Sequence, residues 1–150
     1  NTFQTLKVNN GRMEEFRDGE SRIVLNLAKN PVGANMTLRT LNEMEGEKEL
    51  LFVLNDNIED GCDVSWIWDI NFRNVSRVVT SGSRAYDIAI RIKVSGYDAK
   101  KITVIPDIQA ASDEFLSTTG QKFAIANYSA VQPVRAALKK TIEGKARKNG

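Results

Sequence analysis

Residues 50–72 read LLFVLNDNIEDGCDVSWIWDINF, an apolar run that continues into a segment rich in carboxylates. The apolar run predicts a buried strand over Glu49–Leu54. The positions that follow carry five acidic side chains and the only two tryptophans of the chain: Asp56, Glu59, Asp60, Asp63, Trp66, Trp68 and Asp69. Carboxylates crowded at the end of a buried strand are costly without a partner, so this segment is the first candidate for a functional site.

The rest of the chain alternates short apolar runs with amphipathic segments. Further strands are predicted at Phe3–Val8, Met13–Arg17, Arg22–Ala28, Val75–Thr80, Ile102–Ile105 and Lys122–Ala126. Helices are predicted after Pro31, from Ala85 to Gly96, over Ile108–Ser117 and from Ser129 onward. Their expected N-caps are Ser81 or Ser83, Asp107 and Ser129.

Repeated strand–helix units predict an α/β fold with a mainly parallel sheet and helices packed on it. In such folds the functional loops follow the carboxyl ends of strands. Three loops are expected there: Lys29–Gly33, Asn55–Trp68 and Ser81–Arg84.

Composition is that of one ordinary domain over residues 1–150. A net charge of +2 indicates neither a nucleic-acid partner nor a membrane surface. Residues 140–150 form a basic tail, which we interpret as a solvated, frayed helix end. The single cysteine, Cys62, cannot form an internal disulfide, which favours a reducing cytoplasmic compartment, and no signal peptide or membrane span is expected.

The chain contains no histidine, so it cannot carry a complete Ser-His-Asp or Cys-His site of its own. One cysteine also excludes a cysteine-rich zinc site, and the glycine loop that cradles nucleotide phosphates is missing. Any chemistry must therefore be shared with another domain or chain.

The acidic segment admits several interpretations. A calcium loop that starts at Asp56 would place Ile58 and Ile67 at ligand positions, so that motif is excluded. A magnesium ion held by one or two carboxylates stays open. Alternatively, Asp60 and Gly61 form a turn, and Asp63 or Ser65 caps a short helical turn.

The other candidate residues each have a structural alternative. Trp66 and Trp68 either pack in the core or place one ring against a partner protein. Lys29 and Asn30 open a helix, where they could bind an anion, although Asn30 could simply cap that helix. Arg84 is either an anion contact or a surface charge.

Several runs together resemble the C-terminal domain of MurT, a family of Mur-ligase-like proteins. They begin with Gly11-Arg12-Met13-Glu14 and continue with LNLAKNPVGAN, LNDNIEDGCDVSWIWDINF, GSRAYDIAIRIK and IANYSA. The resemblance covers essentially the whole chain in order, and the motif DG-x-D-x-SWI-[WY]-D is long and rich in aromatic residues. It implies a three-layer, Rossmann-like domain with helices on both faces of the sheet, and it marks residues 1–18 as the junction and edge strands.

The resemblance also implies a function. MurT is the synthetase subunit of lipid II isoglutaminyl synthase, which amidates the D-glutamate α-carboxyl of the peptidoglycan stem peptide with ATP and magnesium. The partner subunit, the glutaminase GatD, supplies the ammonia from a cysteine–histidine site. The matching aspartate, here Asp63, would complete that triad, and Asp60, Trp66 and Trp68 would lie at the partner interface.

The same resemblance places Lys29, Asn30 and Arg84 toward the nucleotide and substrate cleft, although related ligases often have an acid or histidine where this chain has Asn26 and Lys29. The central domain that binds most of the ATP and magnesium has no counterpart in this sequence, so we expect the isolated domain to be inactive. The alternative is a non-catalytic α/β module that binds a protein or contacts a nucleotide.

Overall fold

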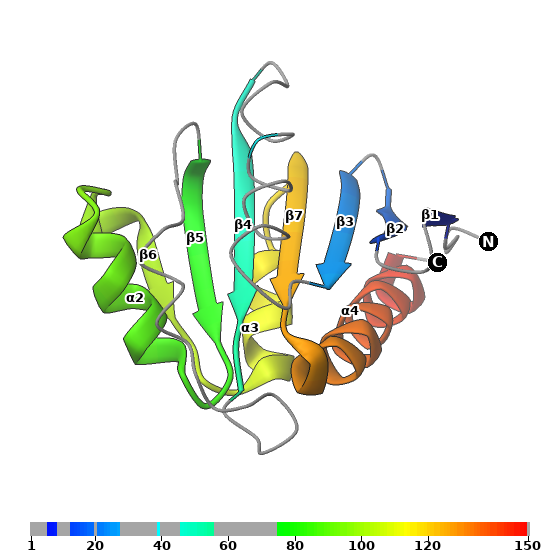
Figure 1. The fold of residues 1–150 in the computed structure, drawn as a ribbon. Helices are drawn as coiled ribbons and strands as arrows, with labels where there is room; N and C mark the ends of the chain where they lie inside the picture. The colour runs from blue at the N-terminus through cyan, green and yellow to red at the C-terminus, as the bar shows by residue number, and fades with distance from the viewer. Residues whose placement is uncertain are drawn as a thin grey trace.

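A computed structural model describes residues 6–8, 13–19, 21–27, 39, 46–55 and 75–149 (Figure 1). Its elements are β1 (Leu6–Val8), β2 (Met13–Asp18), β3 (Ser21–Leu27), β4 (Lys48–Val53), β5 (Val75–Ser81), α2 (Ala85–Val94), the 3-10 turn η3 (Ala99–Lys101), β6 (Ile102–Val104), α3 (Ile108–Phe115), β7 (Gln121–Ala126) and α4 (Tyr128–Asn149). The predicted strands and helices that fall within the described residues are present, with ends shifted by a few residues. The predicted helix after Pro31 lies outside the described residues.

The strands form one seven-stranded sheet in the order β1-β2-β3-β7-β4-β5-β6. β1, β2 and β3 pair antiparallel at one edge, whereas β3, β7, β4, β5 and β6 are parallel to one another. β7 therefore lies between β3 and β4, although it is the last strand of the chain. The predicted mainly parallel sheet is confirmed, and the N-terminal strands β1 and β2 lie at one end of the strand order.

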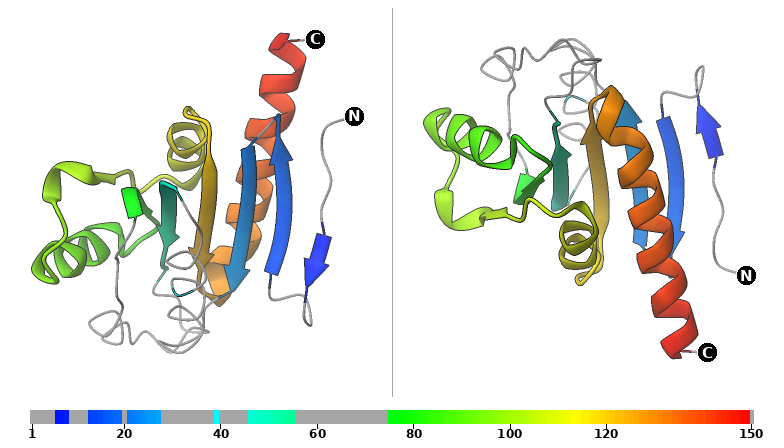
Figure 2. Two further views of the ribbon diagram at one scale, coloured as in Figure 1. Left: turned by 90° about the horizontal axis from the view of Figure 1, so that it is seen from above. Right: turned by 90° about the horizontal axis from the view of Figure 1, so that it is seen from below.

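Helices cover both faces of the sheet, as Figures 1 and 2 show. α2 packs on one face through Ile88 and Ile92. α3 and α4 pack on the other face, where Phe115 and Leu138 belong to a second buried cluster. The three-layer arrangement predicted by the family resemblance is confirmed.

β4 shows why an unbroken apolar run was required at the centre of the sheet. Leu50, Phe52 and Leu54 enter the cluster under α2, and Leu51 and Val53 enter the cluster under α3 and α4. All five side chains are fully buried. Central parallel strands are covered on both faces, so their sequences are continuously apolar rather than alternating.

The helix starts agree only partly with the predicted caps. Asp107 caps α3 as predicted, because its Oδ2 accepts from the backbone N–H of Ala110 at 2.8 Å. The prediction of Ser81 or Ser83 for α2 is wrong: the N-cap is Arg84, and no side-chain hydrogen bond caps the helix. Ser81 instead belongs to β5, and its hydroxyl donates to the Pro106 carbonyl oxygen at 3.1 Å.

α4 also differs from prediction at both ends. It begins at Tyr128, one residue before the predicted cap Ser129, and the Asn127 carbonyl accepts the N–H groups of Ala130 and Val131. It continues to Asn149, so the basic tail is regular helix rather than a frayed end. Burial of Ile142 and the bonds of Lys145 Nζ to Asp18 Oδ2 and the Leu116 carbonyl oxygen hold the helix on the domain as far as Lys145.

Candidate functional site

The carboxyl ends of β4, β5, β6 and β7 meet at one edge of the sheet. They bring together Asn55, the turn Gly82–Ser83, the pair Pro106–Asp107 and Asn127. Backbone hydrogen bonds connect these ends directly, from Asn127 N–H to the Val53 carbonyl at 3.3 Å and from Gly82 N–H to the Pro106 carbonyl at 3.0 Å. This is the edge at which loops of a parallel sheet carry function.

Two asparagines fix the point where the chain leaves β4. Asn127 is only 6% exposed, and its Nδ2 donates to the Asn55 carbonyl oxygen at 2.6 Å. The Asn55 N–H donates to Asn127 Oδ1 at 3.2 Å, and Asn55 Oδ1 accepts from the Ser83 N–H at 2.9 Å. Asn55 is thereby joined to the ends of both β7 and β5.

The turn after β5 approaches β4 so closely that only glycine fits. Gly82 has a φ of +89°, and a Cβ there would lie 2.3 Å from the Leu54 carbonyl oxygen. That oxygen accepts the Arg84 N–H at 3.0 Å, while the Ala85 N–H donates to the Gly82 carbonyl oxygen at 3.2 Å. The N–H groups of Ser83, Arg84 and Ala85 are thus already used within the protein.

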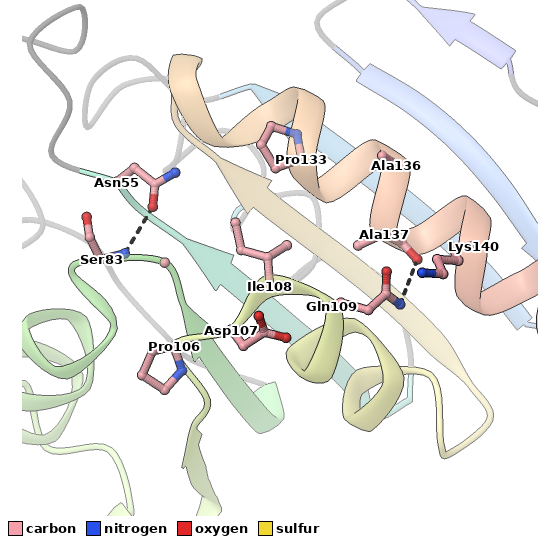
Figure 3. A pocket seen from close by; sticks show the side chains of 11 residues that line it. Asn55, Ser83, Pro106, Asp107, Ile108, Gln109, Pro133, Ala136, Ala137 and Lys140 are labelled. Atoms are coloured by element: carbon pink, nitrogen blue, oxygen red, sulfur yellow. Dashed lines mark hydrogen bonds between the residues drawn. The ribbon is translucent and has the colours of Figure 1, made fainter.

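A groove of about 500 Å³ opens beside this edge, between the start of α3 and the middle of α4 (Figure 3). Its polar side chains are Asn55, Ser83, Asp107, Gln109 and Lys140. Its apolar wall comes from residues such as Ile108 and Pro133. The groove therefore has both polar and apolar walls, and Asn55, the residue before the acidic segment, is part of its lining.

Arg84 is the one predicted anion contact that the structure describes. Its Nε lies 3.0 Å from Asp87 Oδ2 within the first turn of α2. The N–H groups of Ser83, Arg84 and Ala85 already have partners within the protein, so these three do not form a phosphate cradle. We therefore derive no nucleotide step from it, and the assignment of Arg84 to the nucleotide cleft stays a prediction.

The other predicted site residues, Lys29, Asn30, Asp60, Asp63, Trp66 and Trp68, lie outside the described residues. Asn55 is the last described residue before Asp60 and Asp63 in the sequence. The roles assigned to them stay predictions.

Sequence reasoning missed a buried ionic network at the opposite edge of the sheet. Glu49 Oε1 lies 2.7 Å from Lys122 Nζ and 2.9 Å from an Arg77 nitrogen, and both its oxygens accept from Thr118. Arg77 also binds the Glu114 carboxylate and the last carbonyls of α3. A signal was present, since Glu49, Arg77 and Lys122 each interrupt the start of an otherwise apolar strand.

The outer face of α2 exposes three large apolar side chains. Tyr86, Ile90 and Val94 are 64%, 57% and 62% exposed and follow one another at a spacing of four residues. Side chains at this spacing share a helix face. Together they form an exposed apolar stripe along the outer face of α2.

Two features are absent from the described residues. No helix among them is long and apolar enough to cross a membrane. None of their acidic, cysteine or histidine side chains gather into a group of three or more that could hold a metal ion.

Solved structures share this fold. MurF from Acinetobacter baumannii aligns with a TM-score of 0.62 and 18% identity, over 91% of this chain and 31% of that chain. UDP-N-acetylmuramate-alanine ligase MurC from Thermotoga maritima aligns with a TM-score of 0.58 and 11% identity, over 87% of this chain and 28% of that chain. Folylpolyglutamate synthase from the same organism aligns with a TM-score of 0.56 and 22% identity, over 91% of this chain and 30% of that chain. The fold is thus that of a domain carried by Mur-type ligases.

Sequence comparison identifies the family of Mur-type ligases to which the chain belongs. The MurT ligase C-terminal family model matches residues 27–131, and the chain belongs to that family. It is 36% identical over 149 residues to the MurT subunit of lipid II isoglutaminyl synthase (glutamine-hydrolyzing) of Staphylococcus aureus strain COL, covering 96% of this chain and 34% of that protein. The Streptococcus pneumoniae R6 subunit of the same name is 36% identical over 104 residues, 66% of this chain and 23% of that protein. The chain thus spans about a third of the S. aureus relative, and the predicted family is confirmed.

Proposed function

We propose that this chain is the C-terminal domain of the ligase subunit of a glutamine-hydrolysing lipid II isoglutaminyl synthase. The observation that carries the proposal is the 36% identity over 149 residues with the S. aureus MurT subunit. The whole enzyme would work in the cytoplasm, in peptidoglycan synthesis, and amidate the D-glutamate α-carboxyl of lipid II. ATP and magnesium would bind mainly outside this chain, so the domain alone would be inactive.

Within that enzyme, the domain would dock a GatD-type glutaminase and donate Asp63 to its cysteine–histidine pair. A triad aspartate holds the imidazole in the required tautomer and stabilises the imidazolium, and it need not lie on the same chain as the histidine. The absence of histidine from this chain agrees with such a divided site.

The short sequence distance between Asp63 and the carboxyl edge of the sheet supports the proposed role of Asp63. Asp63 follows Asn55 by eight residues in the sequence. The Asn55 backbone is held by Asn127, and its side chain is held by the Ser83 N–H. The residue from which the chain continues toward Asp63 is therefore anchored, and a rigid attachment favours precise placement of a catalytic group.

Docking is the second part of the proposal. We assign the partner interface to Asp60, Trp66 and Trp68, because tryptophan is enriched at the centres of protein interfaces. The exposed stripe of Tyr86, Ile90 and Val94 supports the general expectation that this domain contacts another protein.

The test uses the complex of the full ligase subunit with its glutaminase. Asp63→Asn should lower glutamine hydrolysis about a thousandfold or more while the two subunits still copurify. Asp56→Asn removes a carboxylate from the same segment and should leave hydrolysis near the wild-type rate.

Wild-type hydrolysis by the Asp63→Asn complex would contradict the assignment. If Asp63 were only a cap, its loss would instead cost about 0.5–2 kcal/mol of stability without a specific loss of activity. Measuring unfolding and hydrolysis on the same variant separates the two roles.

A further inference from the structure

Positive charge is concentrated on the last helix. The sequence of α4 contains six basic residues and one acidic residue, Glu143. The whole chain has a net charge of only +2, so the remainder is slightly acidic. The low net charge of the whole chain therefore does not reflect the strongly basic character of α4.

The C-terminal half of α4 forms one wall of a second groove, of about 630 Å³, with α3 as the other wall. Four basic residues line it: Lys140, Lys145, Arg147 and Lys148. Asp113 is its one lining carboxylate, and Asp113 Oδ1 already accepts from Thr141 Oγ1 at 2.7 Å and from Gln109 Nε2 at 3.2 Å. The groove is thus positively charged.

Three of the four cations remain available to a ligand. Lys145 Nζ is used internally, 2.6 Å from Asp18 Oδ2 and 2.6 Å from the Leu116 carbonyl oxygen. Lys140, Arg147 and Lys148 are exposed, and in the described part of the chain none of them forms an ion pair. We call these three residues the basic face of α4.

The basic face is a row rather than a cradle. Its residues lie seven and eight positions apart, so they share one side of the helix over about 11–12 Å. Gly144 lies between them, and a Cβ added there would meet no atom within 4 Å. The row is therefore open along its length and suits anions spread over a surface better than one enclosed phosphate.

We propose that the basic face of α4 binds the surface of a membrane that contains anionic phospholipids. Each Lys or Arg near such a surface strengthens binding about fivefold, which corresponds to about 1 kcal/mol, so three give roughly a hundredfold. The contact is reversible and peripheral, since no helix of the described residues is long and apolar enough to cross a membrane.

A nucleic acid fits the same surface less well. The groove has no aromatic lining residue on which a base could stack. Three available cations are also fewer than the roughly 6–10 phosphate contacts of a typical duplex-binding protein.

This inference goes beyond the proposed function and does not depend on it. α4 starts at the carboxyl edge of the sheet and extends away from it (Figure 2). Lys140 still lines the groove beside that edge, whereas Arg147 and Lys148 line the second groove farther along the helix. A membrane contact centred on Arg147 and Lys148 would leave the carboxyl edge around Asn55 uncovered.

The experiment is cosedimentation of this chain with phosphatidylcholine vesicles, with and without phosphatidylglycerol, at low and high salt. We expect binding only to the vesicles with phosphatidylglycerol, weakening as salt rises. The triple variant Lys140→Gln/Arg147→Gln/Lys148→Gln should bind about a hundredfold more weakly.

The matched control, Lys93→Gln/Lys100→Gln/Lys101→Gln, removes the same charge from exposed residues of α2 and η3. It should retain binding within a few fold. Equal losses in the two variants, equal binding to neutral vesicles, or tighter binding to duplex DNA would each overturn the proposal. The lipid and salt dependence of the unmodified chain tests it even if a variant unfolds, and none of these readouts involves glutamine hydrolysis.

Discussion

Asn127 Nδ2 donates to the carbonyl oxygen of Asn55 at 2.6 Å, which ties two residues 72 positions apart. The return bond from the Asn55 N–H to Asn127 Oδ1 makes the link reciprocal. Asn55 is the last described residue before the segment that carries Asp63. Asn127, directly after β7, therefore fixes the residue from which that segment continues.

Asn127→Ala should destabilise the domain by about 1–3 kcal/mol, because it leaves the N–H and the carbonyl of Asn55 without these partners. Denaturant unfolding measures the change. Glu143→Ala, at an exposed position of α4, should stay within about 0.5 kcal/mol of the parent. Equal stability of the two variants would show that the asparagine link contributes little.

The Asn127 link also shows where sequence reasoning stops. Apolar periodicity predicted β4 and β7 closely, because both are buried on two faces and read as continuous apolar runs. It could not predict that β7 pairs with β4, since strand order depends on long-range packing. Without that order, nothing in the sequence brings Asn55 beside Asn127.

The ionic network was missed for a related reason. Glu49 is paired in register with both Arg77 and Lys122, on the neighbouring strands β5 and β7. Three charges near strand starts look like ordinary solvent-exposed positions until the register aligns them. The candidate residue Asp63, by contrast, came from a motif that is local in sequence, so it needed no strand order.

Removing either member of the Glu49–Lys122 pair should have unequal effects. Lys122 is 0% exposed, so Glu49→Gln leaves a buried ammonium without its carboxylate and should cost about 3–5 kcal/mol. Lys122→Met should cost less, about 1–3 kcal/mol, because Arg77 and Thr118 still bind Glu49.

The double variant Glu49→Gln/Lys122→Met is the control for this asymmetry. It removes both charges of the pair, so no buried ammonium is left without its carboxylate. The double variant should therefore be more stable than Glu49→Gln alone. Additive losses in denaturant unfolding would contradict the proposed coupling.

The same carboxylate predicts a pH effect. Burial alone would raise the pKa of Glu49, but hydrogen bonds from Lys122 and Thr118 and the charges of Lys122 and Arg77 outweigh it and hold that pKa below 4.5. Because the folded-state pKa is lowered, the carboxylate stabilises the fold above pH 4.5 and loses this contribution as pH falls through the lowered value. The stability gap between the parent and Glu49→Gln should therefore be constant near neutral pH and shrink in acid. A gap that widens in acid would contradict the assignment.

Tyr97 predicts an effect at the alkaline end. Burial, together with the charge of Asp98, raises its pKa to about 12. Its hydroxyl donates to the Val75 carbonyl oxygen at 2.6 Å. With the folded-state pKa above the ordinary 10.0, this stabilisation is complete below pH 10 and is lost as pH rises through about 12.

Tyr97→Phe should accordingly cost about 0.5–1.5 kcal/mol at neutral pH. The cost should shrink in denaturant unfolding as pH rises above 10.0. The difference in tyrosinate absorbance between parent and variant should report one group that titrates near 12. A difference titration centred at the ordinary value of 10.0 would contradict the buried, hydrogen-bonded hydroxyl.

Two glycines should respond to the same substitution with opposite signs. Gly82→Ala places a Cβ 2.3 Å from the Leu54 carbonyl oxygen at a φ of +89°, so the turn between β5 and α2 must shift, at a cost of more than about 1 kcal/mol. Gly144→Ala adds a methyl group to the interior of α4, where no atom lies within 4 Å, and should stabilise the domain by about 0.5–1 kcal/mol. Thermal unfolding should move the two midpoints in opposite directions. If Gly82→Ala were neutral, the close approach of this turn to β4, on which the anchoring of Asn55 depends, would be disproved.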